Sequence, residues 1–324
     1  MRGPGLYCPA LPTSRGIRAV AWGVLLAGVA APALRRRAKL PPAAVLSTAA
    51  LSPVAASVLY KRTPARDVAV CCLNMWAYIA AYEMPHDDPD RLAERVRIDY
   101  PIALDRILGA GVTPTARLQR TFARSGEVRP FERVLVWCHW MWFAVPHGAL
   151  AYVLVRDRDG RNRFPRSAGR MYAVFNLGAI FYWVLPTAPP WWAAAHGALE
   201  DGEALRIRRM MIEYGEQFWG RWWPPLFDVL GGNPLAAMPS LHFATSLMAA
   251  HVLSEVGPIP GAFGWTYATV LGLALVYLGE HYLVDLMGGA ALEETVRRAA
   301  PGLAPRALRL VGALDGLRAL AETA

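Results

Sequence analysis

Hydrophobic and polar residues separate along the chain into long apolar stretches divided by polar intervals. The apolar stretches fall at residues 17–34, 42–60, 67–83, 132–154, 170–187, 240–256, 263–280 and 282–296. A membrane-spanning helix needs about 20 mostly apolar residues. Stretches 132–154 and 263–280 meet this requirement best, whereas 42–60 and 282–296 are marginal. The pattern predicts an all-α, polytopic membrane helical bundle.

Two polar intervals are long enough to hold structure of their own. In 84–131, the residues from Leu92 to Tyr100 predict an amphipathic helix on the membrane surface, ended by Pro101. Interval 188–239 is rich in tryptophan and proline, and tryptophan is typical of the membrane–water boundary. We expect this interval to form a cap over the outer leaflet, with a short basic helix near Leu205 to Tyr214.

Composition supports the membrane assignment. Of 324 residues, 55% are apolar and 18% are charged, and the mean hydropathy is +0.24. An ordinary soluble domain has about 25% charged residues. The four cysteines have no metal-ligand spacing and predict no disulfide framework.

The net charge of +9 is distributed in a way that argues against nucleic acid as a partner. Arginines crowd 156–170, and two more follow residue 296. Excess arginine in short loops marks the cytoplasmic side. Interval 188–239 and the turn at 279–281 are therefore expected on the opposite, outer side of the membrane. Both flanks of 42–60 are basic, so the number of N-terminal spans stays open, and residues 15–33 favour an uncleaved first helix over a signal peptide.

The first segment with candidate chemistry runs from Asn233 to His242, immediately before an apolar stretch. Pro239 suits the first turn of a helix, where its missing N–H costs nothing. The N–H groups of Ser240, Leu241 and His242 would then point out of a positive helix end, a geometry that binds phosphate without a metal. His242 would lie beside any phosphate held there.

The second segment runs from Gly279 to Gly289. His281 and Asp285 are four residues apart, so on a helix they lie on one face. An aspartate in an apolar stretch is costly and is a functional candidate by default. A carboxylate on one ring nitrogen leaves the other nitrogen of His281 as a nucleophile. Gly288 and Gly289 would allow close helix packing at this level.

Each pattern alone occurs often by chance, but the two together, on the same predicted side, indicate a catalytic site. The remaining histidines have simpler explanations. His139 and His147 fit a polar pair or the lining of a pocket, and His251 fits a structural role. No cluster has zinc-ligand spacing, so no metal is expected.

Met-Pro-Ser-Leu-His242 and His281-Tyr-Leu-Val-Asp285 resemble the second and third motifs of the phosphatidic acid phosphatase type 2 superfamily. The His-Tyr-x-x-Asp form is similar to that of the inositol phosphorylceramide synthase-like branch. The resemblance covers about 67–296 and implies a six-helix bundle, a phosphohistidine intermediate and no metal. It implies that His281 is the nucleophile, that Asp285 orients it, and that His242 is the general acid.

The chain also departs from the phosphatase branch. Ala274 and Leu275 replace a Ser-Arg pair, and only Arg129-Pro130 matches the end of the first phosphatase motif. The segment Leu185–Trp192 resembles the corresponding loop of the synthase-like branch, which makes Pro190 and Trp191 candidates for substrate binding. No motif assigns the cations that hold phosphate. The candidates, whose alternative role is contact with lipid headgroups, are Arg206, Arg208, Arg209 and Arg221.

These observations predict three parts: N-terminal membrane-associated segments at 1–66, a six-helix catalytic domain at 67–296, and a cytoplasmic tail at 297–324. The expected activity is metal-independent and cofactor-free lipid phosphotransfer. A phospholipid or other phosphorylated lipid is the donor, an alcohol or water is the acceptor, and the site faces outward from the cell membrane. The alternatives are a phosphatase acting on phosphatidic acid or a polyprenyl diphosphate, and a non-catalytic lipid transporter.

Overall fold

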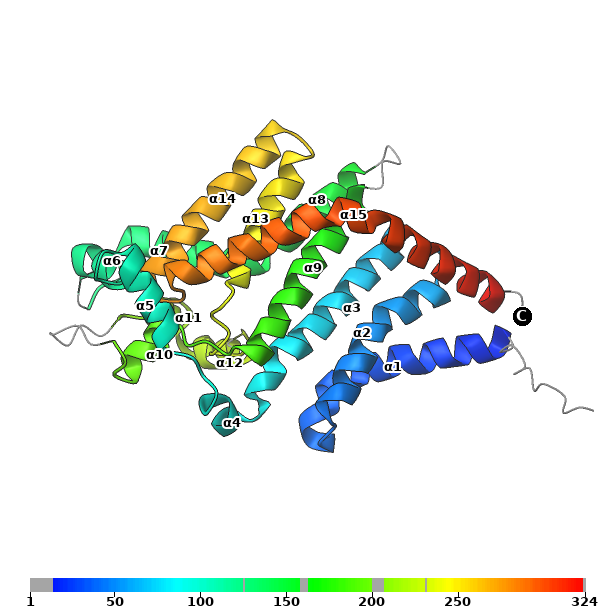
Figure 1. The fold of residues 1–324 in the computed structure, drawn as a ribbon, viewed down its shortest axis with the longest axis horizontal. Coiled ribbons are helices and arrows are strands. Elements are labelled where there is room, and N and C mark those ends of the chain that lie inside the picture. The colour runs from blue at the N-terminus through cyan, green and yellow to red at the C-terminus, as the bar shows by residue number, and fades with distance from the viewer. Residues whose placement is uncertain (1–13, 125, 158–162, 200–206, 231, 323–324) are drawn as a thin grey trace, which may run out of the picture. The chain divides into compact units, whose positions relative to one another are not determined.

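The computed structural model describes residues 14–124, 126–157, 163–199, 207–230 and 232–322 (Figure 1). Over these residues the chain is helical and forms no strand, which confirms the all-α prediction. Residues group into two compact units, Met1–Ala80 with Gly302–Ala324, and Ala81–Pro301. The predicted domain boundaries at 66 and 297 stay predictions.

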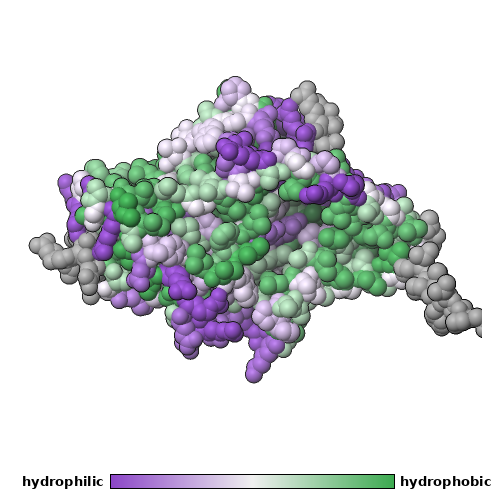
Figure 2. All heavy atoms as spheres, viewed as in Figure 1, coloured by the Kyte–Doolittle hydropathy of each residue, from purple (hydrophilic) through white to green (hydrophobic). Residues whose placement is uncertain are grey.

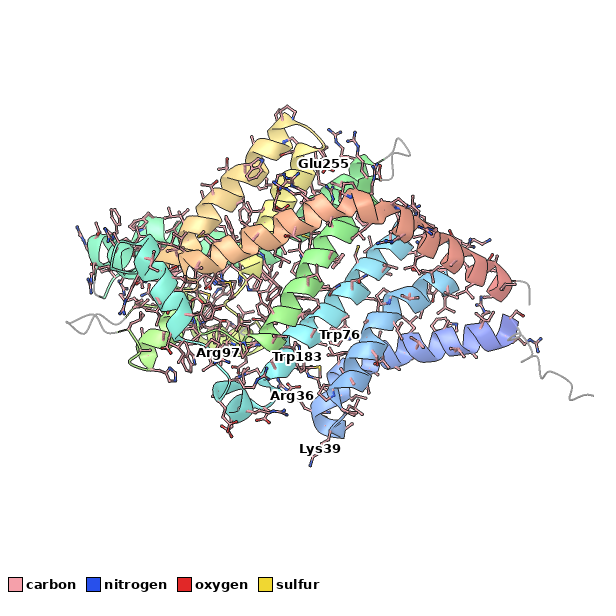
Figure 3. The ribbon with its side chains drawn as sticks, viewed as in Figure 1. Arg36, Lys39, Trp76, Arg97, Trp183 and Glu255 are labelled. Atoms are coloured by element: carbon pink, nitrogen blue, oxygen red, sulfur yellow. The ribbon has the colours of Figure 1, made fainter. Side chains whose placement is uncertain are left out.

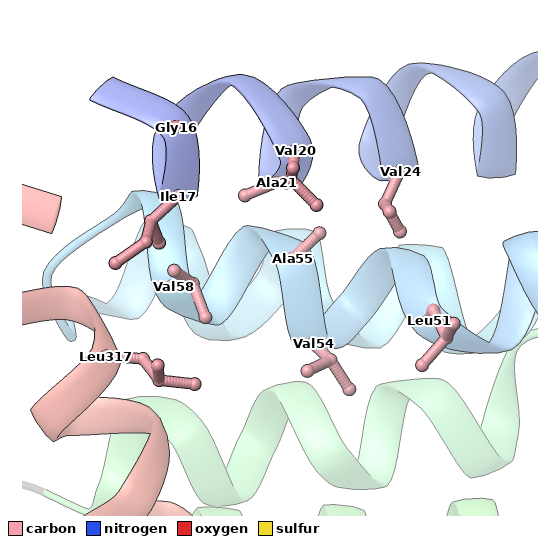
Figure 4. A pocket seen from close by; sticks show the side chains of 10 residues that line it. All are labelled: Gly16, Ile17, Val20, Ala21, Val24, Leu51, Val54, Ala55, Val58 and Leu317. Carbon is pink, nitrogen blue, oxygen red and sulfur yellow. The ribbon is translucent and has the colours of Figure 1, made fainter. Parts of the chain in front are cut away.

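The first unit is built on a helical hairpin of α1 (Ser14–Ala38) and α2 (Pro42–Leu59). A Cβ on Gly28 would lie 2.4 Å from the carbonyl oxygen of Thr48, so glycine permits the close approach. Apolar side chains of α1, α2 and the end of α15 (Leu283–Glu322) line a groove beside the hairpin (Figure 4). Both α1 and α2 are long and apolar enough to cross a membrane. This favours two N-terminal spans, including the marginal 42–60.

The second unit is organised around α13 (Leu241–Ser254), which packs against α8 (Val145–Arg156), α9 (Arg163–Val184) and α14 (Pro258–Tyr277). Helix α7 (Pro130–Trp140) packs against α14. The small side chains Ala244, Ala249 and Ala250 of α13 are fully buried, which lets these neighbours approach closely.

The hydropathy pattern correctly locates the apolar helices, but it does not predict which of them are long and straight enough to cross a membrane. Helix α14 qualifies as a span, and 132–154 qualifies only as a broken pair, with a 53° bend between Pro130–Phe143 and α8. Helix α13 has 14 residues, about 21 Å at 1.5 Å per residue, against a hydrocarbon core of about 30 Å. Among the described residues, the helices containing 67–83, 170–187 and 282–296 miss the same criteria. Hydrophobic side chains nevertheless cover much of the visible surface (Figure 2), as expected of a membrane protein.

The polar interval before α7 folds differently from the prediction. It contains α4 (Pro89–Ala93), α5 (Asp99–Leu108) and α6 (Pro114–Phe122). The helix predicted from Leu92 to Tyr100 is wrong. Pro101 lies in the first turn of α5, where its missing N–H costs little, and so does not end a helix. Leu104, Ile107 and Leu108 are exposed, whereas Ile102 and Asp105 are buried, so α5 has the amphipathic character of a surface helix.

Interval 188–239 contains α10 (Pro190–Ala195), α11 (Met210–Trp219), a short 3₁₀ turn and α12 (Trp223–Leu230). The predicted basic helix near 205–214 is wrong in its bounds, because α11 begins after the arginines and 200–206 lie outside the described residues. Three extended segments meet here through bridges of Arg97 with Thr187 and of Thr187 with Ala236. Figure 3 labels Arg97 in this region. The last of these segments leads directly into α13.

Candidate active site

The segment before α13 ends in a side-chain cap. Ser240 is the N-cap residue, and its Oγ accepts a hydrogen bond from the Phe243 N–H at 3.3 Å. Pro239 therefore precedes the helix, and its predicted place in the first turn is wrong. The Ser240 N–H donates to the Asp285 carbonyl oxygen at 3.0 Å, so it is not a free phosphate donor. Of the three predicted amide donors, those of Leu241 and His242 remain candidates for binding phosphate.

The start of α15 brings His281 and Asp285 together, although not by the predicted geometry. The helix begins at Leu283, so His281 precedes it, and the expectation that both residues lie on one helix face is wrong. Asp285 instead reaches back, and its Oδ2 accepts from the Tyr282 N–H at 2.9 Å. The same oxygen lies 3.3 Å from Nδ1 of His281. Both side chains are buried, at 5% and 0% exposure.

Close backbone packing joins these two segments. A Cβ on Gly289 would lie 2.4 Å from the carbonyl oxygen of Ser240. A Cβ on Gly288 would lie 2.6 Å from the sulfur of Met238. The predicted role of the two glycines in close packing is confirmed: they allow the second turn of α15 to approach the segment immediately before α13.

Three histidines converge at this junction. Nε2 of His281 lies 3.3 Å from Nδ1 of His242. The ring of His139, from α7, lies with its centroid 4.9 Å from that of His242, and Trp142 covers the same ring at 4.2 Å. Nδ1 of His139 is buried and has no hydrogen-bond partner among the described residues.

The sequence did not place His139 in the site. It allowed a pair with His147, but Nδ1 of His147 lies 3.3 Å from the carbonyl oxygen of Phe143. His139 lies beside His242, and its expected role as the lining of a pocket stays a prediction. The sequence feature that could have identified His139 is an ionisable ring in an apolar stretch, because burying such a residue in a membrane costs free energy and marks it as a functional candidate.

Among the candidate arginines that the structure describes, Arg209 lies next to this junction. Its guanidinium lies 3.1 Å from a carboxylate oxygen of Glu280, the residue before His281. It also stacks over Trp191 at 3.8 Å. The backbone N–H of Trp191 donates to the Gly279 carbonyl oxygen at 3.1 Å, so the loop carrying Trp191 is joined to the turn before His281.

The other proposed phosphate ligands are placed differently. Arg208 binds Glu213 and the carbonyl oxygens of Arg124 and Glu127, and hydrogen bonds to Glu213 raise its pKa above the usual value. Arg221 is exposed and stacks with Trp222. Pro190 is buried at the start of α10, which indicates a structural role. Arg206 lies outside the described residues.

A group of possible metal ligands lies elsewhere. His251, Glu293 and Glu294 approach one another near the C-terminal end of α13, where Figure 3 labels Glu255. The Glu294 carboxylate is already bound by Arg297 and Arg298. His251 lies nine residues after His242 on α13, so this group is separate from the junction of His139, His242 and His281.

Comparison with known proteins agrees with the two motifs. A family model of the PAP2 superfamily matches residues 102–294, which is more than half of the chain. Inositol phosphorylceramide synthase of Candida albicans is 29% identical over 166 residues, which cover 48% of this chain and 34% of that protein. The inositol phosphorylceramide synthase catalytic subunit aur1 of Schizosaccharomyces pombe is 28% identical over 131 residues, 38% of this chain and 29% of that protein.

The matched segments thus cover about a third of these relatives' length. No solved structure matches the chain significantly. The family match includes both His242 and the His281–Asp285 pair, together with most of α5, helices α6 to α14 and the start of α15. The chain therefore belongs to the PAP2 superfamily, and its sequence is similar to inositol phosphorylceramide synthases.

Proposed function

We propose that this membrane protein is an enzyme that transfers a phosphoryl or phospho-headgroup from a lipid to an alcohol or to water through a phosphohistidine at His281. The observation that carries the proposal is the ordered contact Asp285–His281–His242, with the carboxylate at Nδ1 of His281 and His242 at Nε2. A carboxylate on Nδ1 fixes the tautomer that leaves a lone pair on Nε2. That nitrogen is then a nucleophile of the kind that covalent catalysis requires.

The proposed reaction has two steps. Nε2 of His281 attacks phosphorus, the bond to the leaving oxygen breaks, and His242 gives that oxygen a proton. His242 then takes the proton of the acceptor hydroxyl as this oxygen displaces His281 from phosphorus. His242 gives up its contact with Nε2 when substrate enters, which leaves it beside the reacting atoms. The amides at the start of α13 and the Arg209 guanidinium would stabilise the charge on the phosphoryl oxygens.

We propose an outward-facing site in the cell membrane. The arginine-rich interval 156–170 and Arg297–Arg298 mark the opposite side by the positive-inside rule. The tryptophan-rich interval 188–239 belongs at the outer boundary. The names of the relatives favour a synthase that uses a phosphorylated lipid, with an alcohol as acceptor.

Lipid mass spectrometry tests the proposal directly. Purified protein in vesicles would receive mixed phospholipids with inositol and ceramide as acceptors. A new phospho-headgroup lipid that requires His281 supports transfer, whereas free phosphate alone supports the phosphatase alternative. No His281-dependent product, together with lipid movement between leaflets, would favour the transporter and reject the proposal. The exposed His196 supplies a matched alanine control.

We expect EDTA to leave the activity unchanged. In the proposed mechanism, the nucleophile is a neutral ring nitrogen, and the developing charge is stabilised by Arg209 and a helix end. Neither contribution needs a metal ion. Initial rates with and without chelator test this. A loss of activity that zinc or magnesium restores would contradict the mechanism.

Replacing Arg209 by alanine is expected to lower kcat/KM by about 100-fold, since a positioned charge at the phosphoryl oxygens typically contributes at this level. Arg209→Lys should recover only part of the loss, because lysine lacks the planar face that stacks on Trp191. Arg221→Ala is the control and should change kcat/KM less than twofold. Equal losses in the Arg209 and Arg221 variants would show that general attraction to anionic lipid, not a specific contact, was removed.

A further inference from the structure

The first turn of α15 has backbone donors that its own sequence cannot satisfy. The opening N–H groups of a helix lack intrahelical partners, and a Ser, Thr, Asn or Asp at the N-cap normally accepts from one of them. The N-cap position here is Tyr282, whose side chain is not a capping group. Asp285 satisfies the Tyr282 N–H, which leaves the next two amides, those of Leu283 and Val284.

Asp105 of α5 accepts from both of these amides. Its Oδ2 lies 3.0 Å from the Leu283 nitrogen, and its Oδ1 lies 2.9 Å from the Val284 nitrogen. The residues are 178 and 179 positions apart in the chain. Asp105 is fully buried, so both oxygens are used within the protein. The helix that follows His281 is thus capped by a different helix.

The electrostatics suit this arrangement. A carboxylate at a helix N-terminus faces the positive end of the helix dipole, and hydrogen bonds to an ionised group are stronger than neutral ones. Burial raises the pKa of Asp105 to about 6, while the Leu283 and Val284 amides act to lower it. Asp105 is therefore ionised above pH 7, with both oxygens able to accept.

Segment 97–105 is also joined to the structure before α13. The Tyr100 hydroxyl lies 2.8 Å from the hydroxyl of Thr187. The Arg97 N–H donates to the Pro186 carbonyl at 2.8 Å, and Thr187 in turn exchanges backbone hydrogen bonds with Leu235 and Ala237. The same short region therefore holds the beginning of α15 and the segment that carries His242.

We propose that Asp105 is a positioning residue, which fixes the first turn of α15 and so holds Nε2 of His281 against His242. The inference rests on the proposed function of His281. Among the described contacts, Asp105 touches neither histidine, so it acts through the backbone of Leu283 and Val284. Its loss should therefore impair the chemical step and leave substrate binding intact.

Asp105→Asn tests the proposal with nearly the same side-chain shape. The amide keeps one accepting oxygen but turns its NH₂ towards a backbone N–H, so one hydrogen bond is lost and two donors face each other. We expect kcat to fall by about 30- to 100-fold, as for a small displacement of a reacting group, with KM changed less than twofold. Asp99→Asn, at an exposed position in the first turn of the same helix, should change neither constant.

A double-variant cycle separates positioning from general destabilisation. If Asp105 acts through the His281–Asp285 pair, then Asp105→Asn should reduce kcat much less in an Asp285→Asn background than in the wild type. If the two substitutions damage the structure independently, their fold losses in kcat should multiply instead. Asp105→Glu keeps the carboxylate and should retain more kcat than Asp105→Asn. Multiplicative losses, the reverse order of these variants, or a rise in KM alone would overturn the proposal.

Hydrogen–deuterium exchange tests the cap without any activity. Amides of the peptide covering residues 282–285 should exchange at least about tenfold faster in Asp105→Asn, with the remainder of α15 and the Asp99→Asn variant unchanged. Unchanged exchange overturns the inference whatever the activity. Faster exchange in a protein whose wild type shows no His281-dependent turnover would support the cap and reject the proposed function.

Discussion

Replacing His281 by alanine is expected to abolish both turnover and covalent labelling by a phospholipid that carries ³²P in its phosphate. His281 is the only histidine in the described site with a carboxylate at one ring nitrogen and its other nitrogen directed at a second histidine. Removal of a nucleophile that acts together with an acid–base partner costs about 10³-fold or more in other enzymes. The measurement compares steady-state rates with the amount of label trapped by rapid quenching, and the label should have the acid lability of a phosphohistidine.

The control for this experiment is His196→Ala. His196 is exposed and stacks on Trp192, so its loss removes a histidine without touching the site. It should keep wild-type labelling and rates. Label that persists in His281→Ala would place the nucleophile elsewhere, and the neighbouring rings of His242 and His139 would then be the candidates.

The pairing of His281 with Asp285 was predictable from spacing, although the local geometry was not. Residues four apart approach each other on a continuous helix, and they also approach when the second residue, in the first helical turn, reaches back to the chain just before the helix. The structure has the second arrangement, with α15 beginning at Leu283. The predicted contact survives because both arrangements place the carboxylate beside the imidazole.

Asp105 and His139 were not predictable as site residues because their contacts depend on tertiary packing. The spacing of residues in the sequence predicts only contacts within one helix, whereas Asp105 binds the Leu283 N–H of α15, which is 178 positions away in the chain. Because Pro101 was expected to end a helix, the sequence did not predict α5, which begins at Asp99 and carries Asp105. For His139, the decisive fact is which face of α7 turns towards α13, and an apolar helix with a bend after it does not reveal that face.

The four candidate arginines were equivalent in sequence, and the three that the structure describes, Arg208, Arg209 and Arg221, are distinguished by their partners. Arg208 is engaged by Glu213 and two carbonyl oxygens, so moving it to a substrate would leave those groups without their donor. Among the described residues, Arg209 has one carboxylate partner, Glu280, beside His281, and it stacks on Trp191, which keeps its guanidinium in place. We propose that a phosphate entering at His281 competes with Glu280 for Arg209, while the stacking on Trp191 keeps the guanidinium in place.

Replacing His242 by alanine should reduce turnover of the lipid substrate by about 10²–10⁴-fold, the usual contribution of a positioned acid–base group. The loss should depend on the leaving group. A lipid alkoxide is a poor leaving group and needs the proton from His242, whereas a nitrophenolate leaves without it. With a nitrophenyl phosphate ester, His242→Ala should therefore lose less than about tenfold. Steady-state rates with both substrates provide the comparison.

His281→Ala should be inactive on both substrates, because attack on phosphorus is required whatever the leaving group. His147→Ala, which changes a histidine of α8 bonded to its own helix region, should match the wild type on both. An equal loss on both substrates in His242→Ala would mean that His242 binds phosphate or aligns His281 and is not the acid. A selective loss would assign proton transfer to His242, since only the protonation of the leaving oxygen distinguishes the two reactions.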